Sequence, residues 1–286
     1  MSRALNGRSN LYNAAARAKA RKASLIDTTR MRQLIQQGTD SIGASIGEMG
    51  YRAEMDIYGS RMSGADAIEA ALFHNLDNDL AGVLKFCQGH LKSLVAIYVE
   101  RFDYEKAKTV LRAINGGASD EIIESQILPS ENPRNAPWLN IVRNTEGLQE
   151  AIEAMSGTSW GMTLSKLDAD ATLEDMENAL DLQYFSDALK AVRGRDGGPR
   201  LRRYLRMEID HRNVINEFRA IRMGMTVEKR QSMVIPGGKI DSGTMRQACQ
   251  AESDEELIET LRRSSSFDDS GFDEAMAEAK RMGSLD

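Results

Sequence analysis

Proline, cysteine, aromatic residues and long apolar runs are all scarce in this chain. Of its 286 residues, five are proline, two are cysteine and 6% are aromatic. So few prolines, beside 23 glycines, exclude a collagen-like or a disordered chain. Two cysteines, Cys87 and Cys249, exclude a disulfide framework. With no secretory leader evident, we expect a reduced, cytoplasmic compartment.

The longest strongly apolar run is "LVAIYV" at residues 94–99, far short of the ~20 residues that a membrane-spanning helix needs. If the protein works at a membrane, we expect it to act from outside the bilayer. What the chain does have is Ala, Leu, Met, Glu, Arg and Lys, which lose little side-chain freedom in helices. Together with 41% hydrophobic and 28% charged residues, this predicts a soluble, all-α protein of two or three compact units.

The net charge of −6 is unevenly distributed. Residues 1–32 contain eight Arg and Lys against one acid, Asp27, whereas residues 251–286 contain eleven acids against four bases. Basic segments of this kind bind nucleic-acid phosphates, anionic lipids or acidic partners. Nucleic acid is disfavoured here, because Tyr12 is the segment's one aromatic residue and the sequence pI is near 5.4.

Two stretches of the chain align with each other without a gap. Residues 102–129 and 209–236 match at a constant offset of 107 residues, and eight positions are identical, where chance would give roughly two. The identical pairs are Asp103/Asp210, Arg112/Arg219, Ala113/Ala220, Ile114/Ile221, Gly117/Gly224, Glu121/Glu228, Ser125/Ser232 and Pro129/Pro236.

Both stretches have the pattern of a helix, a tight turn and a short second helix. Their apolar positions are spaced by four, three and four residues, which places them on one helix face. Gly117 and Gly224 predict helix ends with positive φ, and Ser119 and Thr226 predict caps for the following helix. A proline closes each unit. The two stripes are Ala107, Leu111, Ile114 and Ala118 in the first copy and Val214, Phe218, Ile221 and Met225 in the second.

The similarity extends upstream and recurs a third time. Residues 176–189 resemble 68–81, and residues 145–155 resemble 39–49, with Tyr51 or Trp160 soon after. A third opening at 253–267 has a Ser-x-x-Glu capping box, and "FDEAM" at 272–276 predicts that the next helix begins there. We therefore expect a basic N-terminal helical segment (1–38), two helical repeats (39–144 and 145–251) and an incomplete third repeat (252–286).

Residues typical of catalysis or ligand binding do not form a recognisable set, so we predict no catalytic, cofactor-binding or metal site. "IPGGKID" lacks the first glycine of a phosphate loop, where Met233 stands instead. Cys87 and His90 offer two ligands, while a closed zinc site needs four. "RGRDGGP" (193–199) indicates a turn.

Asp103 and Asp210 are interpreted as acids on a polar face near a helix N-terminus. Arg112 and Arg219 are expected to pair within their own domain or to extend over it. Met223, Met225 and Met233 are expected to fill the core.

The sequence resembles the C subunit of the archaeal A-type and V-type ATP synthases, a relative of the V-ATPase d subunit. Three features carry the resemblance: "MEIDHRNVINEFRAIRMGM" followed by "VIPGGKI", the Ser/Thr…Leu…Leu…aromatic segment that opens each unit, and the beginning "YNAAARAKARKASLI". The first copy departs from the pattern, with Lys106 where the second has Asn213, and the third unit lacks its second half.

The resemblance implies a funnel-shaped, all-helical subunit of three similar domains, peripheral on the cytoplasmic side of the cell membrane. It implies a socket that sits on the ring of proteolipid subunits and receives the central shaft, which is made of the D and F subunits. On this basis we expect no enzyme activity, cofactor, small-molecule ligand or nucleic acid, and contact with the membrane only indirectly. The coupling ion, H⁺ or Na⁺, is not specified. The alternative is a free-standing helical-repeat scaffold, or a nucleic-acid adaptor that uses the basic segment.

Overall fold

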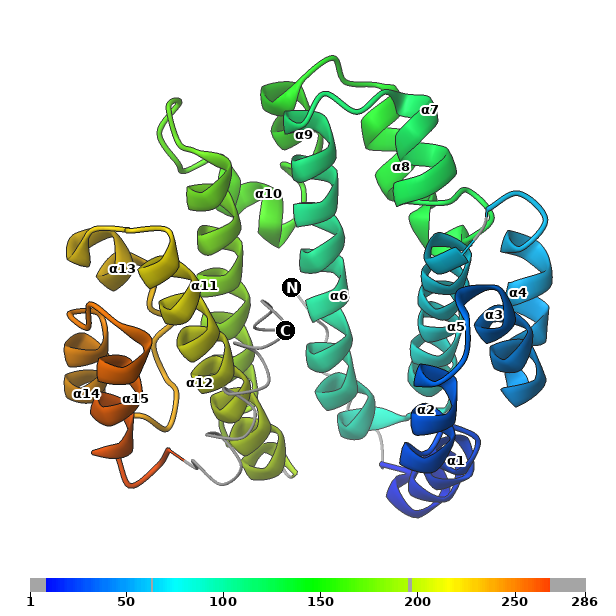
Figure 1. Cartoon of the computed structure of the whole chain (residues 1–286), viewed down its shortest axis with the longest axis horizontal. Helices are drawn as coiled ribbons and strands as arrows, with labels where there is room; N and C mark the ends of the chain where they lie inside the picture. The colour runs from blue at the N-terminus through cyan, green and yellow to red at the C-terminus, as the bar shows by residue number, and fades with distance from the viewer. Residues whose placement is uncertain (1–8, 63, 195–196, 268–286) are drawn as a thin grey trace. The chain divides into compact units, whose positions relative to one another are not determined.

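The computed structural model describes residues 9–62, 64–194 and 197–267, and among these every regular element is a helix (Figure 1). The prediction of an all-α fold is thereby confirmed. The backbone divides into two compact units, Met1–Leu180 and Asp181–Asp286. No helix in the described ranges is long and apolar enough to cross a membrane. The predicted helix at 272–276 lies outside the described residues.

Within its described residues, the first unit contains ten α-helices, the start of an eleventh and three short segments of π- or 3₁₀-helix. The helices are α1 (Leu11–Ala23), α2 (Thr28–Ile35), α3 (Thr39–Ile46), α4 (Arg52–Tyr58), α5 (Gly64–Phe86), α6 (Gly89–Asn115), α7 (Asp120–Ile122), α8 (Ala136–Arg143), α9 (Leu148–Ala154), α10 (Ser159–Leu164) and α11 (Leu173–Ala191). The π-helical segments are η1 (Gly47–Tyr51) and η2 (Ile123–Ile127), and the 3₁₀ segment is η3 (Pro133–Asn135).

The basic segment begins with α1, which is tied to the turn between α5 and α6. The side chain of Asn10 donates to the carbonyl of Phe86 at 2.7 Å and accepts from the amide of Gln88 at 3.0 Å. Arg17 and Arg21 lie over the Phe86 ring, and Arg21 also pairs with Asp79 of α5. Two of the segment's cations are therefore engaged within the unit.

The second unit contains the rest of α11 and the helices α12 (Gly198–Arg222), α13 (Val227–Met233), α14 (Ser242–Ala248) and α15 (Asp254–Arg262). Its apolar core joins α12, α14 and α15 around Phe218, with Met245, Leu257 and Leu261 fully buried or nearly so. Ser253 caps α15 by accepting from the amide of Glu256 at 3.2 Å. The capping function predicted for the third opening is thus confirmed.

The two aligned stretches have the same backbone hydrogen bonds at the end of their long helices. After α6, the amide of Ala118 donates to Ala113 at 3.0 Å, and after α12 the amide of Met225 donates to Ala220 at 3.0 Å. Gly117 and Gly224 have φ of 70° and 64°, as this reversal requires. Ser119 and Thr226 then cap α7 and α13. The predicted helix–turn–helix is confirmed in both copies.

The two apolar stripes are buried to the same pattern. Ala107 and Leu111 are fully buried, and their counterparts Val214 and Phe218 are nearly so. The last two positions of each stripe are half-buried. Met223 departs from the expectation of core filling. It is 69% exposed, because it follows Ile221 by two residues and so lies off the stripe.

Removing the Phe218 ring should destabilise the protein strongly. Phe218→Ala leaves a cavity in the core of the second unit and should lower the free energy of unfolding by about 3–5 kcal/mol. Met223 lies five residues further along the chain but is exposed, so Met223→Ala should lower the free energy of unfolding by less than ~0.5 kcal/mol. Urea unfolding followed by circular dichroism measures both. Equal losses would show that the buried face of α12 is misassigned.

Candidate functional site

Asp103 and Asp210 lie in the middle of long helices, not near helix N-termini as the sequence predicted. α6 starts at Gly89 and α12 at Gly198, because no proline, glycine or cap interrupts the helix between its first turn and the aspartate. The dipole of the helix N-terminus therefore does not explain either acid. Burial raises the pKa of both carboxyls above its ordinary value.

Asp210 holds the loop that follows α13. Its carboxylate accepts from the backbone amides of Lys239 at 2.8 Å and Ile240 at 3.1 Å. Gly238 approaches so closely that a Cβ there would lie 2.0 Å from Asp210 Oδ1. The carbonyl of Gly238 in turn accepts from Nε and Nη2 of Arg206 at 3.1 and 2.7 Å. Two side chains of α12 thus fix the backbone beneath Lys239.

Three residues after Asp210, Asn213 holds the start of the same loop. Its amide donates to the carbonyl of Ile235 at 2.9 Å and its oxygen accepts from the Ile235 amide at 2.9 Å. This one side chain satisfies both backbone groups of Ile235, which is buried. The loop after α13 is therefore secured at two points by side chains of α12.

In the first copy, Lys106 replaces Asn213. Its ammonium contacts Asp77 and Asn135, both at 2.7 Å. Asn135 donates to the carbonyl of Pro129 at 3.0 Å. The first copy therefore secures the equivalent segment through a buried relay.

The second unit also contains a buried ion pair. Arg230 of α13 donates to Glu217 of α12 at 2.8 Å and to the carbonyls of Ala248 and Ala251 at 2.9 and 2.7 Å. Cys249 donates its thiol to the other oxygen of Glu217 at 3.3 Å. Burial, together with the Glu217 carboxylate, raises the pKa of Cys249 to about 12. These charged groups satisfy one another, so the network stabilises the packing of α12, α13 and the end of α14.

The ligand types that the sequence offered are not brought together. No group of three or more His, Cys, Asp or Glu side chains could hold a metal ion in the described parts of the chain. His74 is buried and bonds to the Tyr58 hydroxyl at 3.0 Å. Cys87 packs with Ala14 and Phe86 in a small apolar cluster.

Arg112 pairs bidentately with Glu177 of α11, and both contacts measure 2.6 Å. The two residues belong to the same compact unit. The sequence analysis placed Glu177 in the second repeat (145–251), so this pair joins α6 of the first predicted repeat to α11, the third α-helix of the second.

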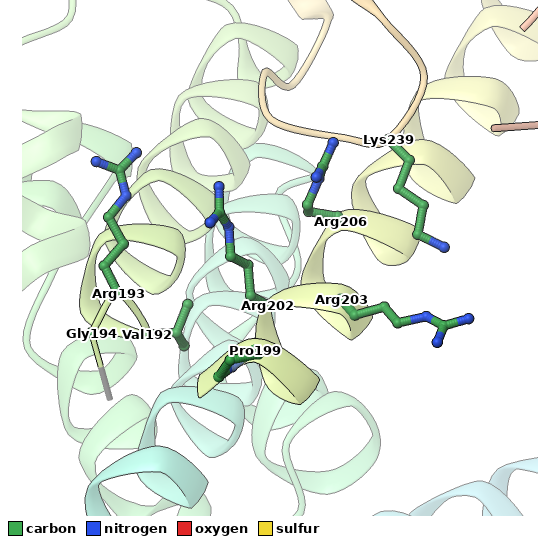
Figure 2. A pocket seen from close by; sticks show the side chains of 8 residues that line it. All are labelled: Val192, Arg193, Gly194, Pro199, Arg202, Arg203, Arg206 and Lys239. Carbon is green, nitrogen blue, oxygen red and sulfur yellow. The ribbon is translucent and has the colours of Figure 1, made fainter. Parts of the chain in front are cut away.

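A strongly basic hollow lies beside the first turns of α12 (Figure 2). It has a volume of about 400 Å³ and is lined by Val192, Arg193, Gly194, Pro199, Arg202, Arg203, Arg206 and Lys239. None of these eight residues is acidic. The side chains of Arg193, Arg202 and Arg203 are exposed, and none forms an ion pair with an acid among the described residues. Lys239 enters from the loop that Asp210 and Arg206 hold.

Sequence reasoning missed this basic hollow, although a signal was present. Pro199, Arg202, Arg203 and Arg206 follow the spacing i, i+3, i+4 and i+7, which places them on one face of a helix. Lys239 had no such signal, since it reaches the hollow only through the tertiary contacts of its loop.

Comparison with known proteins places the chain in a family. Residues 14–285 match the ATP synthase (C/AC39) subunit family. The chain belongs to this family.

Curated relatives of this ATP synthase subunit share one name, the C subunit of the A-type ATP synthase. The relative from Haloquadratum walsbyi is 31% identical over 283 residues, covering 97% of this chain and 80% of the relative. That of Haloferax volcanii is 30% identical over 262 residues, covering 90% and 74% respectively. That of Methanosarcina mazei is 30% identical over 240 residues, covering 81% and 65%. The resemblance noted in the sequence is confirmed.

The two repeat aspartates of this ATP synthase protein should differ in their effect on stability. Asp210→Ala removes the acceptor of two backbone amides and should cost about 1–3 kcal/mol. Asp103→Ala, at the equivalent position, loses only a partly exposed pairing with Arg134 at 3.8 Å and should cost less than ~1 kcal/mol. Thermal unfolding of both variants tests this. A larger loss for Asp103→Ala would contradict the assigned role of Asp210.

Breaking the buried ion pair should be costly as well. Glu217→Gln leaves the buried Arg230 guanidinium without its counter-charge and should lower stability by about 3–5 kcal/mol. Asp56→Asn is a matched control. It breaks the exposed pairing with Arg52 at 3.9 Å and should cost no more than ~0.5 kcal/mol. Chemical denaturation gives both values, and equal small losses would mean that Arg230 is solvated rather than buried.

Proposed function

We propose that this chain is a non-catalytic central-stalk subunit, the socket between the membrane ring and the rotating shaft of an A-type ATP synthase. Membership of the ATP synthase (C/AC39) subunit family over residues 14–285 carries this proposal. On this proposal its partners are the proteolipid ring and the D and F subunits of the shaft, and it resides on the cytoplasmic side of the cell membrane. On this proposal, related helical units would form the socket.

The repeated construction supports a mechanical role. One elementary charge that crosses 100 mV supplies ~2.3 kcal/mol, so a joint held by a few kcal/mol would slip under the torque of several charges. Contacts spread over related units would share that load. The helix–turn–helix of each copy is held by matching backbone hydrogen bonds and by buried polar groups, which would make each copy a stiff element.

Part of the basic segment is available for such contacts. Lys19 and Lys22 are exposed on α1 and have no ion pair with the described residues, whereas Arg21 is committed to Asp79. Exposed lysines attract acidic partners or an anionic membrane surface and are screened by salt. The second candidate, a nucleic-acid adaptor, rests on the same charges, but no described aromatic ring other than Tyr12 accompanies them on α1.

Reconstitution tests the proposal. A purified catalytic head, ring and shaft should synthesise ATP from an ion gradient only when this chain is added, while the head alone keeps its ATP hydrolysis. The isolated chain should hydrolyse no ATP. Full coupling without the chain would refute the proposal.

A pair of variants shows whether α1 contributes to attachment. Lys19→Gln/Lys22→Gln should weaken binding to the ring-containing membranes, and the loss should shrink in high salt. Lys85→Gln/Lys166→Gln removes the same charge from two other exposed positions of the first unit and should bind as the unaltered chain does. Co-sedimentation measures both, and equal binding of the two variants would exclude α1 from the attachment surface.

A further inference from the structure

The basic hollow is unusual because its arginines lie at the N-terminus of a helix. Arg200, Arg202, Arg203 and Arg206 all fall in the first nine residues of α12, and the first turn contains no acid. The positive end of the helix dipole lies at this terminus, so cations here are disfavoured and anions are favoured. Arg202 and Arg206, four residues apart, also repel each other along the helix.

The chain does little to relieve this repulsion within its described residues. Arg206 donates to a neutral group, the carbonyl of Gly238. The charge of the Asp210 carboxylate acts on Arg206 and Lys239, but its two oxygens accept from backbone amides. These hydrogen bonds from the backbone amides hold the loop in place, so the backbone that carries the Lys239 side chain is fixed. Figure 2 shows the side chains of Arg202 and Arg206 extending in the same direction from α12, while Lys239 extends from its loop on the other side of Arg206 and Arg203 is directed away from Arg202.

We propose that this hollow binds a compact phosphate-bearing anion. A phosphate group carries more than one charge and several acceptor oxygens, and it can therefore engage cations that approach from different sides, whereas a single carboxylate carries one charge. The volume of about 400 Å³ accommodates a headgroup-sized ligand. Val192 and Pro199 provide an apolar part of the wall. This site departs from the expectation from sequence that the chain has no small-molecule ligand.

Two sources share this chemistry: a soluble phosphate compound and the headgroup of an anionic phospholipid. Binding of the full chain to inorganic pyrophosphate, by titration calorimetry, represents the first. Co-sedimentation with vesicles of phosphatidylcholine and phosphatidylglycerol, against vesicles of phosphatidylcholine alone, represents the second. Neither assay depends on coupling, so their outcome is independent of the stalk function proposed above.

Arg202→Gln/Arg203→Gln should weaken binding of whichever probe is recognised at least about tenfold. Arg246→Gln/Arg263→Gln removes the same charge from two exposed positions of the second unit and should leave binding unchanged. Lys239→Gln is a second test from a different element, and its backbone contact to Asp210 is retained. Circular dichroism confirms that each variant is folded.

Each outcome decides the proposal. Variant-sensitive binding of pyrophosphate identifies a soluble phosphate compound, variant-sensitive binding of the anionic vesicles alone identifies a lipid headgroup, and both together show recognition of the phosphate group from either source. Binding of neither probe, or an equal loss in the Arg246/Arg263 control, overturns the site. A short poly-glutamate peptide that binds as tightly, with the same dependence on Arg202 and Arg203, overturns the preference for phosphate.

Discussion

The architecture of each repeat depends on one reversal of the backbone, at Gly117 and Gly224. At both places the backbone amides that follow a long helix donate to carbonyls of its last turn, and a glycine with positive φ permits this. The reversal ends the helix and directs the chain back along it. Because the next residue but one is a cap, Ser119 or Thr226, the second helix begins at once. In each unit of about thirty residues, local interactions therefore fix the turn and the start of the second helix.

From this shared base the two copies differ in how they hold the segment after the short helix. The second copy uses Asn213, which satisfies both the amide and the carbonyl of Ile235. The first copy uses Lys106, which cannot accept a hydrogen bond and instead draws on Asp77 and Asn135. An ammonium that is largely withdrawn from solvent needs a carboxylate, and partial burial lowers the pKa of Lys106. The change of one residue thus required partners at two others, which explains why the polar pattern of the first copy is harder to recognise in sequence.

The sequence could predict those features of the fold that depend on residues close together in the chain. The helical class, the positive φ at Gly117 and Gly224, the caps and the buried stripes all depend on residues within about one or two helix turns, and all are present. The predicted position of Asp210 near the start of its helix was wrong. The prediction took the beginning of the aligned stretch, residue 209, as the start of the helix, but α12 begins eleven residues before it, at Gly198. The contacts of Asp210 with Lys239 and Ile240 span about thirty residues and have no local signal.

The basic hollow follows from the same arrangement. Asp210 and Arg206 lie one helix turn apart on α12, and both hold the loop that contains Lys239. The Asp210 carboxylate accepts hydrogen bonds from backbone amides of the loop, and the Arg206 guanidinium donates to a backbone carbonyl of the loop. The hydrogen bonds to Gly238 lower the number of donors that Arg206 can offer a ligand. The same bonds bring Lys239 to the face of α12 that carries Arg202, Arg203 and Arg206. The contacts that stabilise the repeat therefore also complete the group of cations. A mutation that frees the loop, such as removal of Asp210, acts on stability and on the hollow at once, whereas Arg202 and Arg203 belong to the hollow alone among the described contacts.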